Sequence, residues 1–252
     1  MNRINSLFRF VKFEHTLFSL PLIYSGVYLA APAPPSGGLL LLVLIGAIGA
    51  RTAALALNRI IDREIDKRNP RTLDRELPSG RLRLVEAGVL LVVSLTVYLV
   101  AAAAISDFCL KLSALPLIVF TLYPYMKRFT MLAHFGVGLG LAMAPMGGWF
   151  AVHPTFDGML PGILLSLFTL LWVSGFDIIY STLDEMFDRD ANLYSFTSRL
   201  GKKRALRISA WLHGGSFLAL DRFARCAFRF RYLPLSRSLL QGFRVVVAPI
   251  SL

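Results

Sequence analysis

Long apolar stretches recur along this sequence and limit what it can fold into. They cover about residues 16–32, 38–57, 86–105, 109–126, 131–151 and 160–180, with a weaker stretch at 205–220. A helix needs roughly 20 apolar residues to cross a bilayer. The chain is 56% hydrophobic with a mean hydropathy of +0.61. We therefore predict an all-α membrane protein, a multi-span bundle of transmembrane helices with about seven spans.

The positive charge of the chain is distributed unevenly between the predicted loops. The net charge is +12, and most of the 27 Lys and Arg residues fall on one side of the membrane if the spans alternate. Lys111 falls in a loop on the opposite side. By the positive-inside rule, the basic side and the amino terminus are cytoplasmic. The charge thus indicates topology and contact with anionic membrane lipid or substrate, and we expect no nucleic acid partner.

Two acidic clusters each lie at the end of a predicted span on this basic side. They are Asn58-x-x-x-Asp62-x-x-x-Asp66 and Asp177-x-x-Tyr180-x-x-x-Asp184-x-x-x-Asp188. Residues four apart lie above one another on a helix, so each cluster is expected to form one stripe of carboxylates. Such carboxylates near hydrocarbon are costly without a facing cation. Each stripe therefore predicts half of a Mg²⁺ site.

Basic residues follow both acidic clusters and the fourth predicted span. The candidates to bind an anion are Arg68, Arg71, Lys127 and Arg128, with Tyr123 beside them. Mg²⁺ keeps part of its coordination sphere for phosphate oxygens, while guanidinium groups bind the remaining oxygens in pairs. We therefore predict that three helix ends converge on one metal-bound diphosphate. Lys127 and Arg128 would also suit a role as topology anchors, and this alternative stays open.

Two charged residues lie deeper in the predicted spans. Arg51 precedes Asn58 by seven residues, on nearly the same helix face and about 10 Å deeper. An arginine at that depth needs a cavity and a partner. We expect it to recognise an acceptor carboxylate or the diphosphate, or else to pair with a carboxylate such as Glu14. Asp177 is expected to orient Tyr180 or an arginine, or to be a further metal ligand.

These motifs resemble those of the UbiA-type intramembrane aromatic prenyltransferases. The resemblance is carried, over roughly residues 1–215, by Lys12-Phe-Glu14-His15-Thr16, Asn58 to Asp66, Arg75-Glu-Leu-Pro-Ser-Gly-Arg81, Tyr123-Pro124 with Lys127-Arg128, and Asp177 to Asp188. The sequence looks most like the 4-hydroxybenzoate polyprenyltransferases of ubiquinone and menaquinone synthesis. The resemblance implies Mg²⁺-dependent transfer of a polyprenyl group from polyprenyl diphosphate to a small aromatic acceptor, 4-hydroxybenzoate. It also implies a bacterial inner-membrane protein with cytoplasmic active-site loops.

The resemblance implies a role for each candidate residue. Metal ligands would be Asn58, Asp62, Asp66, Asp184 and Asp188. Catalytic residues would be Asp62, Asp66, Asp184, Asp188 and Tyr180. Substrate-binding residues would be Glu14, Arg51, Arg68, Arg71, Tyr123, Lys127, Arg128 and Asp177. The metal would neutralise the diphosphate as the allylic C–O bond ionises.

The chain departs from this family after about residue 220. Residues 1–220 form the predicted transmembrane domain, whereas Asp221-Arg-Phe-Ala-Arg225 interrupts the weak seventh stretch. Residues 221–252 have the composition of an altered or truncated Arg-rich tail, so the family's nine spans are not all expected. A catalytically impaired relative and, less favoured, a transporter with its site nearer the bilayer midplane stay alternatives. The oligomeric state stays open because lipid-facing and protein-facing helix surfaces are equally apolar.

Overall fold

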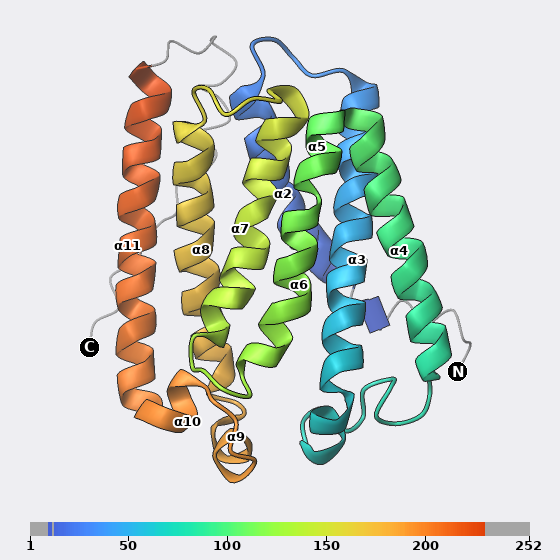
Figure 1. Cartoon of the computed structure of the whole chain (residues 1–252). Helices are drawn as coiled ribbons and strands as arrows, with labels where there is room; N and C mark the ends of the chain where they lie inside the picture. The colour runs from blue at the N-terminus through green and yellow to red at the C-terminus, as the bar shows by residue number, and fades with distance from the viewer. Residues whose placement is uncertain (1–9, 12, 230–252) are drawn as a thin grey trace.

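The fold is an all-helical bundle, as predicted. The structure, a computed structural model, describes residues 10–11 and 13–229, with the backbone alone for 13–18 and 223–229. All regular elements in this part of the chain are helices, and the long ones run side by side (Figure 1). In chain order they are α2 (Phe13–Ala30), α3 (Gly37–Arg68), α4 (Leu84–Ile105), α5 (Asp107–Leu112), α6 (Ala114–Met126), α7 (Ala133–Val152), α8 (Leu160–Ser181), α9 (Glu185–Asp190), α10 (Phe196–Leu200) and α11 (Lys202–Arg229).

Five helical segments of the described chain are long and apolar enough to cross a membrane. They are α3, α4, the consecutive pair α5 and α6, α7, and α8. These segments coincide with five of the predicted spans. At the first predicted span, α2 contains a shorter apolar segment, Ser19–Ala30. At the seventh, α11 forms a helix of the bundle but does not meet the same criteria of length and composition.

Helix α11 continues through the charged segment that was expected to interrupt it. Asp221 and Arg222 lie inside the helix, which runs to Arg229. Both residues are exposed, so neither charge is buried in the bundle. Asp and Arg also have ordinary helix propensities, and charge alone does not end a helix. The predicted interruption is therefore wrong for the backbone, while residues 230–252 lie outside the described part.

Small residues allow the closest helix contacts in the bundle. Helix α2 packs against α7, α3 against α4, and α8 against both α7 and α11. A Cβ atom at Gly26 of α2 would lie 2.0 Å from the carbonyl oxygen of Pro145 in α7. A Cβ atom at Gly148 of α7 would lie 2.0 Å from the carbonyl oxygen of Ile23 in α2. The two backbones therefore approach as closely as glycine permits, which is typical of helix contacts in membranes.

One end of the bundle gathers the segments that carry the charged motifs. The loop 69–83, which follows α3, lies at this end together with α9 and α10 (Figure 1). The loop 31–36 between α2 and α3 lies at the opposite end (Figure 1). The acidic clusters are therefore on the same side of the bundle, as the alternation of spans requires.

Candidate active site

The first acidic cluster forms the expected stripe at the end of α3. Asn58, Asp62 and Asp66 belong to one continuous helix, and Asn58 Nδ2 donates a hydrogen bond to Asp62 Oδ2 at 3.2 Å. Asp62 and Asp66 are only 3% and 5% exposed. Buried carboxylates are stable only with charge compensation. The stripe therefore requires cations from other segments.

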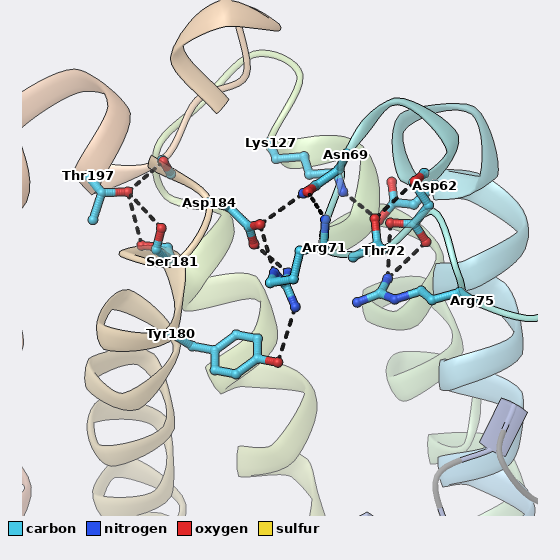
Figure 2. Close-up of polar contacts among 12 residues, drawn as sticks. Asp62, Asn69, Arg71, Thr72, Arg75, Lys127, Tyr180, Ser181, Asp184 and Thr197 are labelled. Carbon is cyan, nitrogen blue, oxygen red and sulfur yellow. Dashed lines mark hydrogen bonds and ion pairs between the residues drawn. The ribbon is translucent and has the colours of Figure 1, made fainter. Parts of the chain in front are cut away.

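Those cations come from the loops after α3 and α6. Lys127 Nζ lies 2.6 Å from Asp62 Oδ2, and Arg128 Nη2 lies 3.7 Å from Asp62 Oδ1. Arg75 Nη1 donates to both carboxylate oxygens of Asp66, at 3.0 and 2.8 Å (Figure 2). Each buried carboxylate of the stripe thus has its own basic partner.

The second acidic cluster is not one stripe, because α8 ends inside it. Asp177 lies on α8, whereas Asp184 precedes α9 and Asp188 lies within it. At the end of α8, the Thr197 hydroxyl donates to the Ser181 carbonyl oxygen at 3.2 Å (Figure 2). The last carbonyls of a helix lack partners within it, and this contact from α10 supplies one. The expectation of a continuous helical stripe through Asp188 is therefore wrong.

Arg71 joins the loop after α3 to the second cluster. Its guanidinium binds both carboxylate oxygens of Asp184, with Nε donating to Oδ1 at 2.8 Å. Its Nη1 donates to the Tyr180 hydroxyl at 3.2 Å, and its guanidinium carbon lies 5.2 Å from the centre of the Tyr180 ring. Asn69 Nδ2 adds a second bond to Asp184 Oδ1 at 2.8 Å (Figure 2). These contacts bring the two acidic clusters together.

The two carboxylates of the α9 segment differ in their electrostatics. Burial raises the pKa of Asp184, but the hydrogen bonds from Arg71 and Asn69 outweigh this effect and hold the pKa below its usual value. Burial also raises the pKa of Asp188, and there the hydrogen bond from Ser195 does not offset it. Asp184 is thus firmly ionised beside a cation of the chain. Asp188 is less well compensated and would gain more from an added cation.

Lys127 and Arg128 have different contacts, although the same two roles, anion binding or topology anchoring, were predicted for both. Lys127 is paired with Asp62, as described above. The Arg128 Nη2 atom donates to the carbonyl oxygen of Ile61 at 2.9 Å, and its guanidinium lies 4.7 Å from the centre of the Tyr125 ring. Lys127 therefore reaches the acidic stripe directly, whereas Arg128 mainly ties the loop after α6 to α3.

Arg68 lies outside the group of contacts that Arg71 makes. Its Nε donates to the carbonyl oxygen of Glu64, one turn earlier in α3, at 3.3 Å in an exposed position. The sequence predicted two anion-binding arginines here, Arg68 at the end of α3 and Arg71 in the loop after it; the structure brings Arg71 to the acidic clusters and leaves Arg68 on the surface.

A second polar centre lies deeper, between α3, α6 and α8. Arg51 Nε and Asp62 Oδ1 are buried and have no hydrogen-bond partner within the described residues. Arg51, Asp62 and Asp177 are each near enough to Tyr123 of α6 to act on it electrostatically. Unsatisfied buried polar groups are costly. The centre therefore suits a ligand that offers an acceptor to Arg51. The side chain of Glu14, the alternative partner of Arg51, lies outside the described part.

Three residues at the site were not among the sequence candidates. Asn69 and Arg75 bind Asp184 and Asp66, and His134 Nδ1 lies 2.7 Å from Asp177 Oδ2. Asn69 also accepts a hydrogen bond from the Arg71 backbone N–H at 2.9 Å, which shapes the loop. The Asn-Pro pair that ends α3 is a turn signal that would have drawn attention to Asn69. A lone histidine such as His134 carries no comparable signal.

The acidic residues fit Mg²⁺ by their chemistry. Within the described residues, no group of three His, Cys, Asp or Glu side chains is close enough to hold a metal ion. The carboxylates are instead paired with basic residues of the chain. Nevertheless, carboxylate oxygens are the ligands that Mg²⁺ prefers, and the buried Oδ1 of Asp62, which accepts no hydrogen bond and has only the longer ion pair with Arg128, could act as one.

An apolar helical bundle with acidic and basic side chains gathered at one end is the architecture of a membrane protein with a polar site at one end of its helices. The sequence matches the UbiA prenyltransferase family over residues 19–246. The chain therefore belongs to the UbiA prenyltransferase family. The matched region includes part of the segment 221–252 that the sequence analysis separated as a tail.

The chain is similar in sequence to proteins that act on 4-hydroxybenzoate. It is 33% identical over 192 residues to a 4-hydroxybenzoate octaprenyltransferase of Haemophilus ducreyi, covering 74% of this chain and 65% of that protein. It is 32% identical over 161 residues to the mitochondrial 4-hydroxybenzoate polyprenyltransferase of Schizosaccharomyces pombe, covering 62% of this chain and 44% of that protein. The chain thus spans less than two thirds of the length of these relatives.

Solved structures confirm the UbiA-type fold. The apo structure of a UbiA homolog from Aeropyrum pernix K1 matches with a TM-score of 0.80 and 34% identity, covering 85% of this chain and 80% of that one. A UbiA homolog from Archaeoglobus fulgidus bound to DMAPP and Mg²⁺ matches with a TM-score of 0.71 and 19% identity, covering 86% of this chain and 77% of that one. At this lower identity, the second likeness concerns the fold alone.

Proposed function

We propose that this protein transfers a polyprenyl group from polyprenyl diphosphate to an aromatic acceptor, 4-hydroxybenzoate, in a Mg²⁺-dependent reaction of ubiquinone or menaquinone synthesis. The observation that carries the proposal is the meeting of both acidic clusters with Arg71, Arg75 and Lys127 at one end of an apolar bundle. A metal-bound diphosphate requires carboxylates and basic groups together. We place this end at the cytoplasmic face of a bacterial inner membrane.

The acidic residues are assigned to the metal. We expect Asn58, Asp62, Asp66, Asp184 and Asp188 to hold Mg²⁺, which supplies positive charge that stabilises the diphosphate as a leaving group. This assignment is supported by the buried Oδ1 of Asp62, which accepts no hydrogen bond, and by the weak charge compensation of Asp188.

The basic residues are assigned to the diphosphate. Without substrate, Arg71, Arg75 and Lys127 neutralise Asp184, Asp66 and Asp62, respectively. In the substrate complex we expect these groups to donate to diphosphate oxygens, because charge-assisted bonds to phosphate are strong and guanidinium groups bind two oxygens at once. The same side chains would thus stabilise the empty site and then the leaving group.

The deeper polar centre is assigned to the aromatic acceptor. Arg51 has an unpaired buried Nε, which suits the carboxylate of a benzoate. Tyr123 and Asp177 lie beside it and would contact the same substrate. Tyr180 lies on the diphosphate side, where its ring faces the Arg71 guanidinium. We expect that ring face to stabilise the allylic cation after the C–O bond breaks.

An apolar cavity of about 550 Å³ is assigned to the prenyl chain. Its walls come from α2 to α8 and include Ala47, one turn before Arg51. They extend to Ile105, Cys109 and Phe156 in the opposite half of the bundle. A chain whose diphosphate lay at the acidic clusters would thus have an apolar path away from them.

Turnover by the purified protein tests the proposal. The protein, reconstituted in lipid nanodiscs, would be supplied with geranyl diphosphate and 4-hydroxybenzoate, and the prenylated benzoate measured by mass spectrometry. We expect product with Mg²⁺ and none with EDTA. Benzoate, which lacks the activating hydroxyl, serves as the control acceptor. Absence of product under all conditions would refute the proposal and favour the catalytically impaired relative.

A further inference from the structure

His134 connects three elements around the proposed acceptor centre. It lies near the start of α7, and its Nδ1 atom is 2.7 Å from Asp177 Oδ2 on α8. The backbone N–H of Phe196, the first residue of α10, donates to His134 Nε2 at 3.3 Å. The two rings are stacked, with centres 5.6 Å apart and planes 25° apart. One buried side chain therefore links α7, α8 and α10.

These contacts define the protonation state of His134. A backbone N–H can only donate, so Nε2 must accept and carries no proton. The proton of the neutral ring then lies on Nδ1 and is donated to Asp177. A proton on Nε2 would place two donors opposite each other and leave the buried N–H of Phe196 without its acceptor. The geometry therefore places the ring proton of His134 on Nδ1, where Asp177 Oδ2 accepts it.

The histidine covers one side of the Asp177 carboxylate and leaves the other accessible. The Asp177 side chain is 31% exposed, whereas that of His134 is 6% exposed. His134 engages Oδ2 and not Oδ1, and Asp177 is near enough to Tyr123 to act on it electrostatically. The orientation of Asp177 at this centre thus depends on His134.

The other contact of His134 leads to the diphosphate side of the site. The Leu193 N–H donates to the Asp188 carbonyl oxygen at 2.8 Å, and the Tyr194 N–H donates to the Lys127 carbonyl oxygen at 2.7 Å. The segment that positions the Phe196 N–H is therefore attached to residues of both the second acidic cluster and the basic loop after α6.

We infer that His134 is a positioning residue, which holds Asp177 toward the aromatic acceptor and couples it to the segment 188–196. The inference rests on the proposed function, since it assigns Asp177 to the acceptor side. His134 itself touches neither substrate. It acts through Asp177, by a donor and an acceptor on one rigid ring.

Two substitutions of His134 distinguish the positioning of Asp177 from a role in packing alone. His134→Gln keeps one donor and one acceptor, whereas His134→Leu keeps neither. Partners that orient a functional side chain commonly contribute about 10-fold to 100-fold. We expect His134→Leu to lower kcat/KM for 4-hydroxybenzoate by about that factor, with KM for geranyl diphosphate changed less than about threefold. His134→Gln should recover most of the loss. Equal losses for both variants, or a loss on the donor side alone, would overturn the inference.

A double-mutant cycle with Asp177→Asn tests whether His134 acts through Asp177. If it does, His134→Leu should cause little further loss once Asp177 is neutralised, because the two changes remove one interaction. If the losses multiply, His134 has a separate role and the inference fails.

The imidazole tautomer provides a readout that needs no turnover. In substrate-free protein labelled with ¹⁵N-histidine, with the resonance assigned by His134→Gln, the nitrogen shifts at pH 7 should report a neutral ring protonated on Nδ1. A doubly protonated ring, or a proton on Nε2, would contradict the arrangement even if His134→Leu failed to fold. A wild-type protein that forms no product would refute the proposed function, whereas this measurement would still decide the contact.

Discussion

Arg71 and Asp184, 113 residues apart in the sequence, form the ion pair that joins the two acidic clusters. Arg71 comes from the loop after α3, and Asp184 comes from the turn between α8 and α9. The pair also orders Tyr180, whose hydroxyl accepts from the same guanidinium. Because these residues belong to opposite sides of the site, the loop after α3 and the α8–α9 turn are held together without substrate.

The first prediction concerns the proposed metal ligands. Asp62→Ala and Asp184→Ala should each lower turnover at saturating Mg²⁺ by at least about 10-fold to 100-fold, because each removes a proposed metal ligand. Asp157→Ala, at an exposed position in the loop between α7 and α8, is the matched control and should keep wild-type turnover. Near-normal rates in both site variants, with normal membrane insertion, would rule out the metal assignment.

The second prediction compares Arg71 with Arg68, the last residue of α3. Arg71→Gln should raise the KM for the prenyl diphosphate by about 10-fold to 100-fold, since a charge-assisted contact contributes about 1.5 to 3 kcal/mol. Arg68→Gln should change it less than about threefold, because Arg68 is bound to the Glu64 carbonyl at the surface. Steady-state kinetics with varied donor measure both. Similar effects of the two substitutions would show that charge, and not position, is what matters.

Arg71→Lys refines the same test. Lysine keeps the charge but cannot bind two oxygens in a fixed plane. We expect only partial recovery of the donor KM relative to Arg71→Gln. Full recovery would mean that Arg71 does not bind two diphosphate oxygens in the way that it binds the two carboxylate oxygens of Asp184.

The third prediction uses neighbouring glycines of α7. Gly148→Ala should destabilise the protein by about 1–3 kcal/mol, because the new methyl group would meet the Ile23 carbonyl of α2. Gly147→Ala adds the same methyl group where no atom lies within 4 Å and should leave stability unchanged or slightly raised. Thermal unfolding in detergent gives the comparison. Equal melting temperatures would argue against the close α2–α7 contact.

The fourth prediction concerns topology. In a background with Cys109→Ser and Cys226→Ser, Ser36→Cys and Ser79→Cys should react with an impermeant thiol reagent from opposite sides of the membrane. The two positions lie in loops at opposite ends of the bundle (Figure 1). Ser79 should react from the cytoplasmic side, because its loop carries much of the basic charge. Labelling of both from one side would contradict the bundle orientation.

Structural features that depend only on residues close together in the sequence could be predicted from it. The apolar stretches predicted most of the observed helices, and four-residue spacing predicted the stripe of Asn58, Asp62 and Asp66 on α3. The same reasoning failed for the second cluster. Its spacing also allowed one helix, but the contact between Thr197 and Ser181 stabilises the end of α8 before Asp184. Thr197 comes from α10, outside the helix, so local periodicity contains no information about this contact.

The sequence by itself determined the all-helical membrane architecture, the end of the bundle that carries charge, and the residue types available to a metal and a diphosphate. These follow from hydropathy, helix period and charge, which are local properties. Only the tertiary structure decided the partners: Arg71 with Asp184, Lys127 with Asp62, and His134 with Asp177. Each pair joins segments distant in the sequence, so its geometry depends on how the helices pack and on the burial that makes charge compensation necessary.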